Sequence, residues 1–267
     1  MELTDLASEL IALASGWLAA GFLGAGRLVA FTQVFVLFST FQFSPFLRML
    51  IALAMSLPLI VAIHGQGGGP PALDGSLLVP IAKELTAGLI LGLFLSIPFY
   101  AAQAAGDFVD TYRGASQANF VTPGNAEETS ESGQTLLFFF MAIYIVEGGL
   151  PVTLQLIYQS YSVVPADAFL PLDFETLVTF LSALFTSIFS LGLMMGGPLL
   201  IALATVDIFF VLMSRSAKNL NLFDLSVAFK NVVLVIALPV YITFLAIYAS
   251  DTWRRVAEDT SAFLRGN

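Results

Sequence analysis

Long apolar runs follow one another along almost the whole chain, and they constrain the fold more than any other feature. Several of them approach or exceed the ~20 residues that a helix needs to cross the hydrocarbon core of a bilayer. Of the 267 residues, 58% are hydrophobic and 11% are charged, whereas a soluble domain carries about 25% charged residues. A soluble protein with a very large core would need shorter apolar stretches. We therefore predict a polytopic, all-α membrane protein with kinked helices and hairpins.

The apolar runs also predict where helices break. The six runs cover residues 10–38, 46–63, 77–105, 135–158, 176–213 and 231–248. Glu147 is followed by two glycines, so we expect a helix break there. The fifth run is too long for one crossing at ~1.5 Å per residue, and the GGPLL sequence from Gly196 is expected to divide it into two helices.

A charged, turn-rich stretch separates the third and fourth runs. Residues 106–132 read GDFVDTYRGASQANFVTPGNAEETSES. A polar segment between membrane-type helices is either an ordinary connection outside the membrane or a segment placed in a water-accessible path. These residues leave both alternatives open.

Ionisable residues within or beside the apolar runs are candidates for a functional role. A charge at membrane depth costs about 2.5 to 3.5 kcal/mol on insertion scales, so it normally faces a bundle interior, a partner or water. The residues concerned are Arg27, Arg48, Glu84, Glu147 and Asp207. They either pair with one another or with a neighbouring subunit during assembly, or some of them line a conduit.

Catalytic and metal-binding chemistry has little support in this sequence. The chain has no cysteine and a single histidine, His64, which we interpret as an exposed bystander. Asp107 and Asp110 are three residues apart and could share a helix face, but we interpret them as solvated or ion-paired loop acids. We therefore predict no catalytic residue, no metal site and no cofactor.

The charge distribution gives contradictory signals about topology. The net charge of −9 argues against nucleic acid as a partner. Acids stand where a secretory leader would carry basic residues, so no cleaved leader is expected. Basic residues lie on both sides of the last apolar run: Arg215, Lys218 and Lys230 before it, and Arg254, Arg255 and Arg265 after it. Either the last two runs form a re-entrant hairpin, or the final helices are buried against partner proteins.

Four motifs occur in order along the chain. Arg27 is followed by Pro45 and by Arg48, which leads into IALAMSLPLI; Glu84, Gly88 and Gly92 precede AAQAAGDFVDTYRG. The third motif is EGGLPVTLQLIYQSYSVVP. The fourth is SRSAKNLNLFDLSVAFK, with matches that include Arg215, Leu220, Asn221, Phe223 and Lys230. Together they resemble the SctT/FliR family, an export-gate component of bacterial type III secretion systems and flagellar export. The YRGAS and SRxA forms resemble the injectisome branch more than the flagellar one.

The resemblance implies a place in a membrane assembly. One copy of such a chain would join several copies of two smaller membrane proteins, SctR/FliP-like and SctS/FliQ-like, with an SctU/FlhB-like switch protein, in the bacterial inner membrane. Unfolded secreted proteins would be transient partners. Residues 10–213 would resemble the larger of these two partner proteins. The hairpin-like part at 214–267 would resemble the smaller one. Helices packed on one another in a helical export gate would explain the contradictory charges.

Under the same resemblance, residues 106–123 correspond to the plug that obstructs the closed channel. Gly106, Gly114 and Pro123 would give this loop a folded-back shape. Its polar contacts would come from Asp107, Asp110, Arg113 and Asn119, while Phe120 and Val121 would seal the channel. The predicted function is a non-enzymatic pore component that conducts unfolded proteins. The alternatives are a secondary transporter of small solutes, which would be built from inverted repeats, and an intramembrane enzyme.

Overall fold

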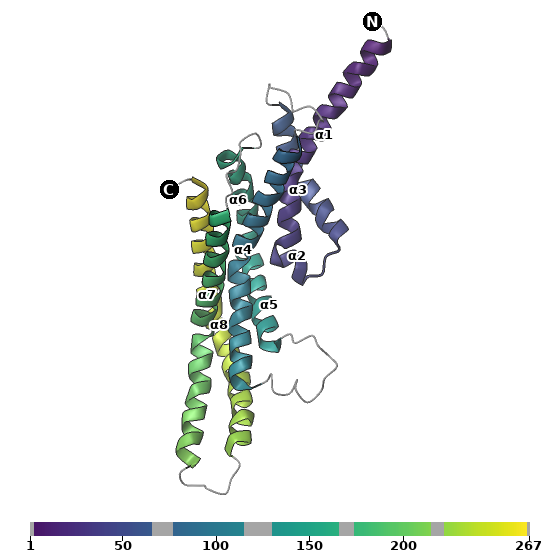
Figure 1. Cartoon of the computed structure of the whole chain (residues 1–267). Coiled ribbons are helices and arrows are strands. Elements are labelled where there is room, and N and C mark those ends of the chain that lie inside the picture. The colour runs from purple at the N-terminus through teal and green to yellow at the C-terminus, as the bar shows by residue number, and fades with distance from the viewer. Residues whose placement is uncertain (1–2, 66–76, 115–129, 166–173, 215–221, 266–267) are drawn as a thin grey trace, which may run out of the picture. The chain divides into compact units, whose positions relative to one another are not determined.

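The described part of the chain is helical. The computed structural model describes residues 3–65, 77–114, 130–165, 174–214 and 222–265, and these residues contain no β-strand. The helices, shown in Figure 1, are α1 (Leu3–Val34), α2 (Val36–Thr40), α3 (Pro45–Gly65), α4 (Leu78–Arg113), α5 (Glu131–Val146), α6 (Gly149–Val163), α7 (Phe174–Ser214) and α8 (Leu222–Arg265). The predicted all-α fold class is confirmed.

Several helices are long and apolar enough to cross a membrane. Five of the described helices meet this condition, or six if the bent pair α5–α6 is counted as one span. The five segments are Glu9–Val34, Pro45–Gly65, Leu78–Arg113, Glu175–Ser214 and Leu225–Ile247. The prediction of a polytopic membrane protein is therefore confirmed.

The predicted break between α5 and α6 is confirmed. The two helices are bent by 76° at this point. Gly148 has φ +72°, a conformation that side-chain-bearing residues rarely adopt. A Cβ atom on Gly149 would collide with the Tyr144 ring. Both glycines are thus needed for this tight turn.

Two other predicted boundaries are wrong. α7 is one 41-residue helix and does not break at Gly196. The reason lies in packing, because a Cβ atom on Gly196 would come within 3.1 Å of the Ala105 carbonyl oxygen of α4. This glycine permits close helix packing and does not end a helix. The segment predicted as a loop from Gly106 also begins as helix, because α4 continues to Arg113.

The chain divides into two compact units. The first unit comprises Met1–Ser96, Pro151–Leu177 and Ala257–Asn267. In it α1 packs against α3, and the Tyr158 hydroxyl of α6 donates to the Met55 carbonyl of α3 at 2.7 Å. Arg48 donates to the carbonyls of Gln33 and Phe43, which ties the end of α1 to the turn before α3.

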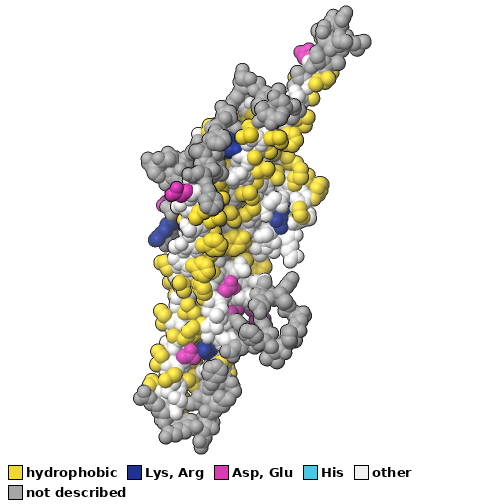
Figure 2. All heavy atoms as spheres, in the orientation of Figure 1, with side chains coloured by type: hydrophobic (Ala, Val, Ile, Leu, Met, Phe, Trp, Pro, Cys, Tyr) yellow, Lys and Arg dark blue, Asp and Glu magenta, His cyan; other side chains and the backbone are white. Residues whose placement is uncertain are grey.

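The second unit comprises Ile97–Leu150 and Val178–Val256. The Phe99 ring of α4 packs edge-on against Phe140 and Tyr144 of α5. α7 and α8 lie side by side (Figure 1), and the Tyr241 hydroxyl of α8 donates to the Met195 carbonyl of α7. Hydrophobic side chains are spread over the visible face in Figure 2. Many of those on α7 and α8 are exposed, as expected for helices that face lipid or other subunits.

Candidate functional site

The end of α4 meets the start of α5 through one buried carboxylate. Asp110 is 5% exposed. Its Oδ2 atom accepts hydrogen bonds from the Ser130 hydroxyl at 2.7 Å and from the Ser132 backbone N–H at 3.0 Å. Its Oδ1 atom accepts from Arg113 Nε at 2.8 Å. We call Asp110, Arg113, Ser130 and Ser132 the loop junction, because they bracket residues 115–129 of the chain.

Local sequence explains why these residues meet. Asp110 and Arg113 have the i, i+3 spacing that places side chains on one helix face. Ser130 is the N-cap of α5 and accepts from the Gly133 N–H at 2.9 Å. Gly114, with φ +84°, ends α4 as left-handed glycines commonly do. A Cβ atom on Gly106 would collide with the Gly133 backbone, so this glycine lets α4 and α5 approach closely.

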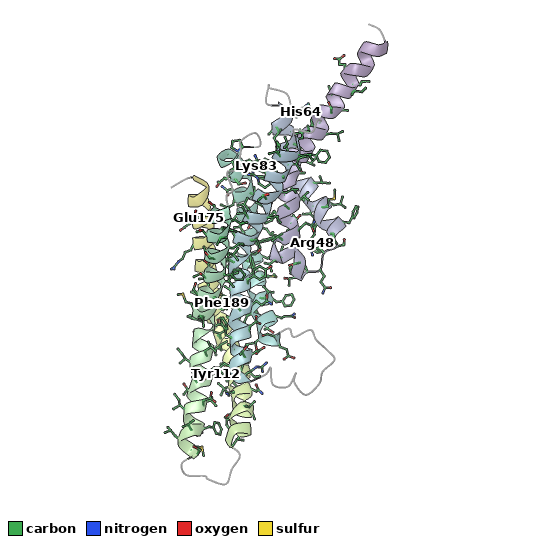
Figure 3. The ribbon with its side chains drawn as sticks, in the orientation of Figure 1. Arg48, His64, Lys83, Tyr112, Glu175 and Phe189 are labelled. Carbon is green, nitrogen blue, oxygen red and sulfur yellow. The ribbon has the colours of Figure 1, made fainter. Side chains whose placement is uncertain are left out.

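α7 and α8 contribute side chains to the same region. Lys230 of α8 forms an ion pair with Asp207 of α7, at 3.1 Å between Nζ and Oδ1. Lys230 Nζ also lies 3.5 Å from the Tyr112 carbonyl oxygen at the end of α4. Arg113 donates through Nη1 to the Asn231 side-chain oxygen at 3.1 Å. Figure 3 shows Tyr112 on the part of α4 that lies beside α7 and α8.

A second polar cluster is buried in the first unit. Arg27 and Glu84 are both 0% exposed. Two parallel bonds join them: Nε to Oε2 at 2.9 Å and Nη2 to Oε1 at 3.1 Å. Lys83 also pairs with Glu84, at 2.9 Å. We call Arg27, Lys83 and Glu84 the buried ion cluster.

The end of α6 completes the buried ion cluster. Arg27 donates to the Ser160 hydroxyl at 2.6 Å and to the Val164 carbonyl at 2.9 Å, and its guanidinium lies 3.8 Å from the centre of the Tyr161 ring. Lys83 donates to the Pro165 carbonyl at 2.6 Å. Two cations thus meet one carboxylate and the negative end of a helix dipole, which favours positive charge. The third sequence motif supplies this end of α6.

The predicted charges fall into distinct settings. Arg27 and Glu84 pair with one another, and Asp207 pairs with Lys230, so pairing within the chain applies to these three. Glu147 is exposed at the C-cap of α5. Arg48 binds backbone carbonyls. Whether any of these five charges serves assembly or a conduit stays a prediction.

Some predicted residues are better defined than others. Asp107 and Asp110 lie on the helix α4, and Asp110 is ion-paired and not solvated. Phe223 lies in α8. Seven predicted residues lie outside the described part of the chain: Asn119, Phe120, Val121, Pro123, Arg215, Leu220 and Asn221.

Sequence reasoning did not select several residues of these sites. Lys83, Ser130, Ser132 and Asn231 were not predicted as site residues. Ser130 carried a recognisable signal, since serine is a preferred N-cap residue and this one stands shortly before the fourth apolar run. The Pro165 carbonyl that accepts from Lys83 lies 82 positions away along the chain, and Arg113, which donates to Asn231, lies 118 positions away, so no local pattern indicates these contacts.

His64 differs from its predicted setting. It is half-buried, and its ring stacks on Trp17 with 3.9 Å between ring centres. The prediction of an exposed side chain is therefore wrong. Within the described residues, no three His, Asp or Glu side chains are placed to hold a metal ion.

Comparison with known proteins gives one family and several relatives. The family model described as "Bacterial export proteins, family 1" matches residues 18–256. The Yop proteins translocation protein T of Yersinia pestis is 31% identical over 189 residues, which cover 71% of this chain and 72% of the relative. The surface presentation of antigens protein SpaR of Salmonella typhimurium is 28% identical over 179 residues, 67% of this chain and 66% of the relative. The flagellar biosynthetic protein FliR of Bacillus subtilis is 27% identical over 178 residues, 64% of this chain and 69% of the relative.

Proposed function

The chain belongs to family 1 of the bacterial export proteins, and on this basis we propose that it is a non-enzymatic pore component of the type III secretion export apparatus. It is a multi-pass protein of the bacterial inner membrane. It is more similar to the injectisome proteins than to the flagellar ones. Its role is to help conduct unfolded proteins across this membrane.

The proposed plug is the segment between α4 and α5. The observation that supports it most is the loop junction, in which Asp110 binds Ser130 and Ser132 and so fixes both ends of residues 115–129. A connection that only had to link two helices would not need a buried carboxylate at its base. An anchored base instead suits a segment that is held in one place in the closed state.

The proposed partners are the other membrane proteins of the apparatus. Its relatives belong to secretion machinery, so the chain assembles with other secretion components. We propose the SctR/FliP-like, SctS/FliQ-like and SctU/FlhB-like proteins as these components. The exposed apolar side chains of α7 and α8 offer a surface of the right chemistry for such membrane helices.

The test of this proposal is the ion conductance of the closed, purified gate complex in a planar bilayer. Residues 115–129 are replaced by a short glycine-serine linker, which leaves the loop junction intact. Small-ion conductance is expected to rise well above that of the intact complex. The matched control shortens the Gly- and Pro-rich segment 66–76 in the same way, and its conductance should stay low. If the 115–129 replacement conducts no more than the control, the plug assignment is wrong.

A further inference from the structure

The C-terminal end of α4 is held by side chains from α8 as well as by its own loop junction. We propose that Lys230 and Asn231 of α8 are positioning residues for the loop junction, so that displacement of α8 from α4 loosens the base of the plug. This inference rests on the proposed function, which makes the loop junction that base. It assigns to the fourth sequence motif, which ends at Lys230, a specific task.

Lys230 contacts a backbone carbonyl at the C-terminal end of α4, as a capping residue would. Tyr112 is the penultimate residue of α4, and its carbonyl is one of those that a helix leaves without an internal partner. Lys230 Nζ lies 3.5 Å from this oxygen and 5.3 Å from the centre of the Tyr112 ring. A cation at a helix C-terminus is also favoured by the helix dipole. Lys230 therefore stabilises the last turn of α4 from outside that helix.

Arg113 connects α8 to the loop junction. Its Nε atom donates to Asp110 at 2.8 Å, and its Nη1 atom donates to Asn231 at 3.1 Å. The guanidinium group is planar and rigid, so the two contacts are geometrically linked. A shift of Asn231 would draw Arg113 away from Asp110, which binds Ser130 and Ser132. This gives a continuous polar path from α8 to both ends of residues 115–129.

The exposure of the Lys230–Asp207 pair makes Lys230 suitable for mutation. The side chain of Lys230 is 9% exposed, whereas that of Asp207 is 34% exposed. If Lys230 is replaced, water can still solvate the Asp207 carboxylate, so the penalty for an unpaired charge is limited. We expect Lys230 variants to fold and to assemble.

The test measures closed-state ion conductance of the whole gate complex, alongside its assembly. Lys230→Met should raise the conductance severalfold without reducing the amount of assembled complex. Lys230→Arg keeps the positive charge near the Tyr112 carbonyl and should stay near the intact level. Asn231→Ala removes one hydrogen bond and should cause a smaller rise. This milder variant is the substitute if Lys230→Met does not assemble.

A charge exchange separates this role from simple pairing of α7 with α8. The double variant Asp207→Lys with Lys230→Asp restores an ion pair between the two helices but places an acid beside the carbonyls of α4. We expect this variant to leak at least as much as Lys230→Met. Conductance at the intact level in the exchanged variant would overturn the inference.

The same measurements distinguish this inference from the proposed function. If the 115–129 replacement raises closed-state conductance while Lys230→Met and Asn231→Ala do not, the plug assignment is supported and the positioning role of α8 is wrong. If the 115–129 replacement does not leak either, the plug assignment itself fails.

Discussion

Arg27 is fully buried, and its guanidinium binds a carboxylate, a hydroxyl and a backbone carbonyl while it lies over an aromatic ring. The sequence alone indicated that Arg27 and Glu84 needed partners, because both stand in apolar runs. The sequence could not indicate that Arg27 and Glu84 form an ion pair with each other, since 57 positions separate them. Charge at membrane depth is therefore predictable from sequence, whereas the choice of partner requires the folded chain.

Replacement of Arg27 should strongly destabilise the chain. Arg27→Met leaves Glu84 buried with Lys83 as its remaining ion-pair partner and deprives the end of α6 of its contacts. Removal of one partner of a buried pair typically costs about 3–5 kcal/mol. Thermal unfolding of the purified chain in detergent should show a clearly lower midpoint.

Glu147→Gln is the matched control for this change. Glu147 is an acid in an apolar region, but it is exposed at the end of α5. Its replacement should alter stability by no more than about 0.5 kcal/mol. If Arg27→Met and Glu147→Gln unfold at the same temperature, the buried ion cluster does not stabilise the fold.

At the scale of the helices, the sequence predicted which helices exist better than it predicted where each helix begins and ends. The apolar runs indicated each long helix, because length and hydropathy are local properties. The last turn of α4 contains the local Asp110–Arg113 pair, but it is also contacted by Lys230 of α8, which lies 118 positions away from Tyr112 and which no local pattern indicates. Gly196 was interpreted as a break in α7, yet it lies against the Ala105 carbonyl. A glycine that permits close packing and a glycine that ends a helix look alike in sequence.

Gly106 provides the test of close packing between α4 and α5. In Gly106→Ala the new Cβ atom would collide with the Gly133 backbone, which cannot move as a flexible side chain can. Overpacking of this kind typically costs about 1–3 kcal/mol. The unfolding midpoint of the isolated chain in detergent should therefore fall.

Gly197→Ala in α7 is the control for the loss of a glycine from a helix. A Cβ atom on Gly197 meets nothing within 4 Å, and alanine favours a helix over glycine by about 1 kcal/mol. This variant should be as stable as the natural chain or slightly more stable. Equal destabilisation by both substitutions would mean that loss of glycine itself, and not the approach of α4 to α5, is responsible.

At the scale of the whole molecule, the exposed apolar side chains of α8 are available to contact either lipid or other subunits. Val235 and Val240 of α8 are 73% and 74% exposed. Composition predicted a membrane protein, but it could not tell lipid-facing side chains from those that face other subunits. The family resemblance implies that the hydrophobic helices pack largely on one another, and the exposure of individual side chains makes this prediction testable.

Protection of α8 on assembly is the last prediction. The chain lacks cysteine, so Val240→Cys introduces a single thiol that a maleimide should label in the detergent-solubilised, isolated chain. In the complex purified with its membrane partners, labelling should fall because neighbouring helices cover this face. A cysteine in place of the exposed Glu175, at the start of α7, controls for general loss of reactivity.

Native mass spectrometry of the same samples should show one copy of this chain with several copies of smaller partners. A stable monomer without companions, or equal labelling of Val240→Cys in both samples, would contradict assembly through α8.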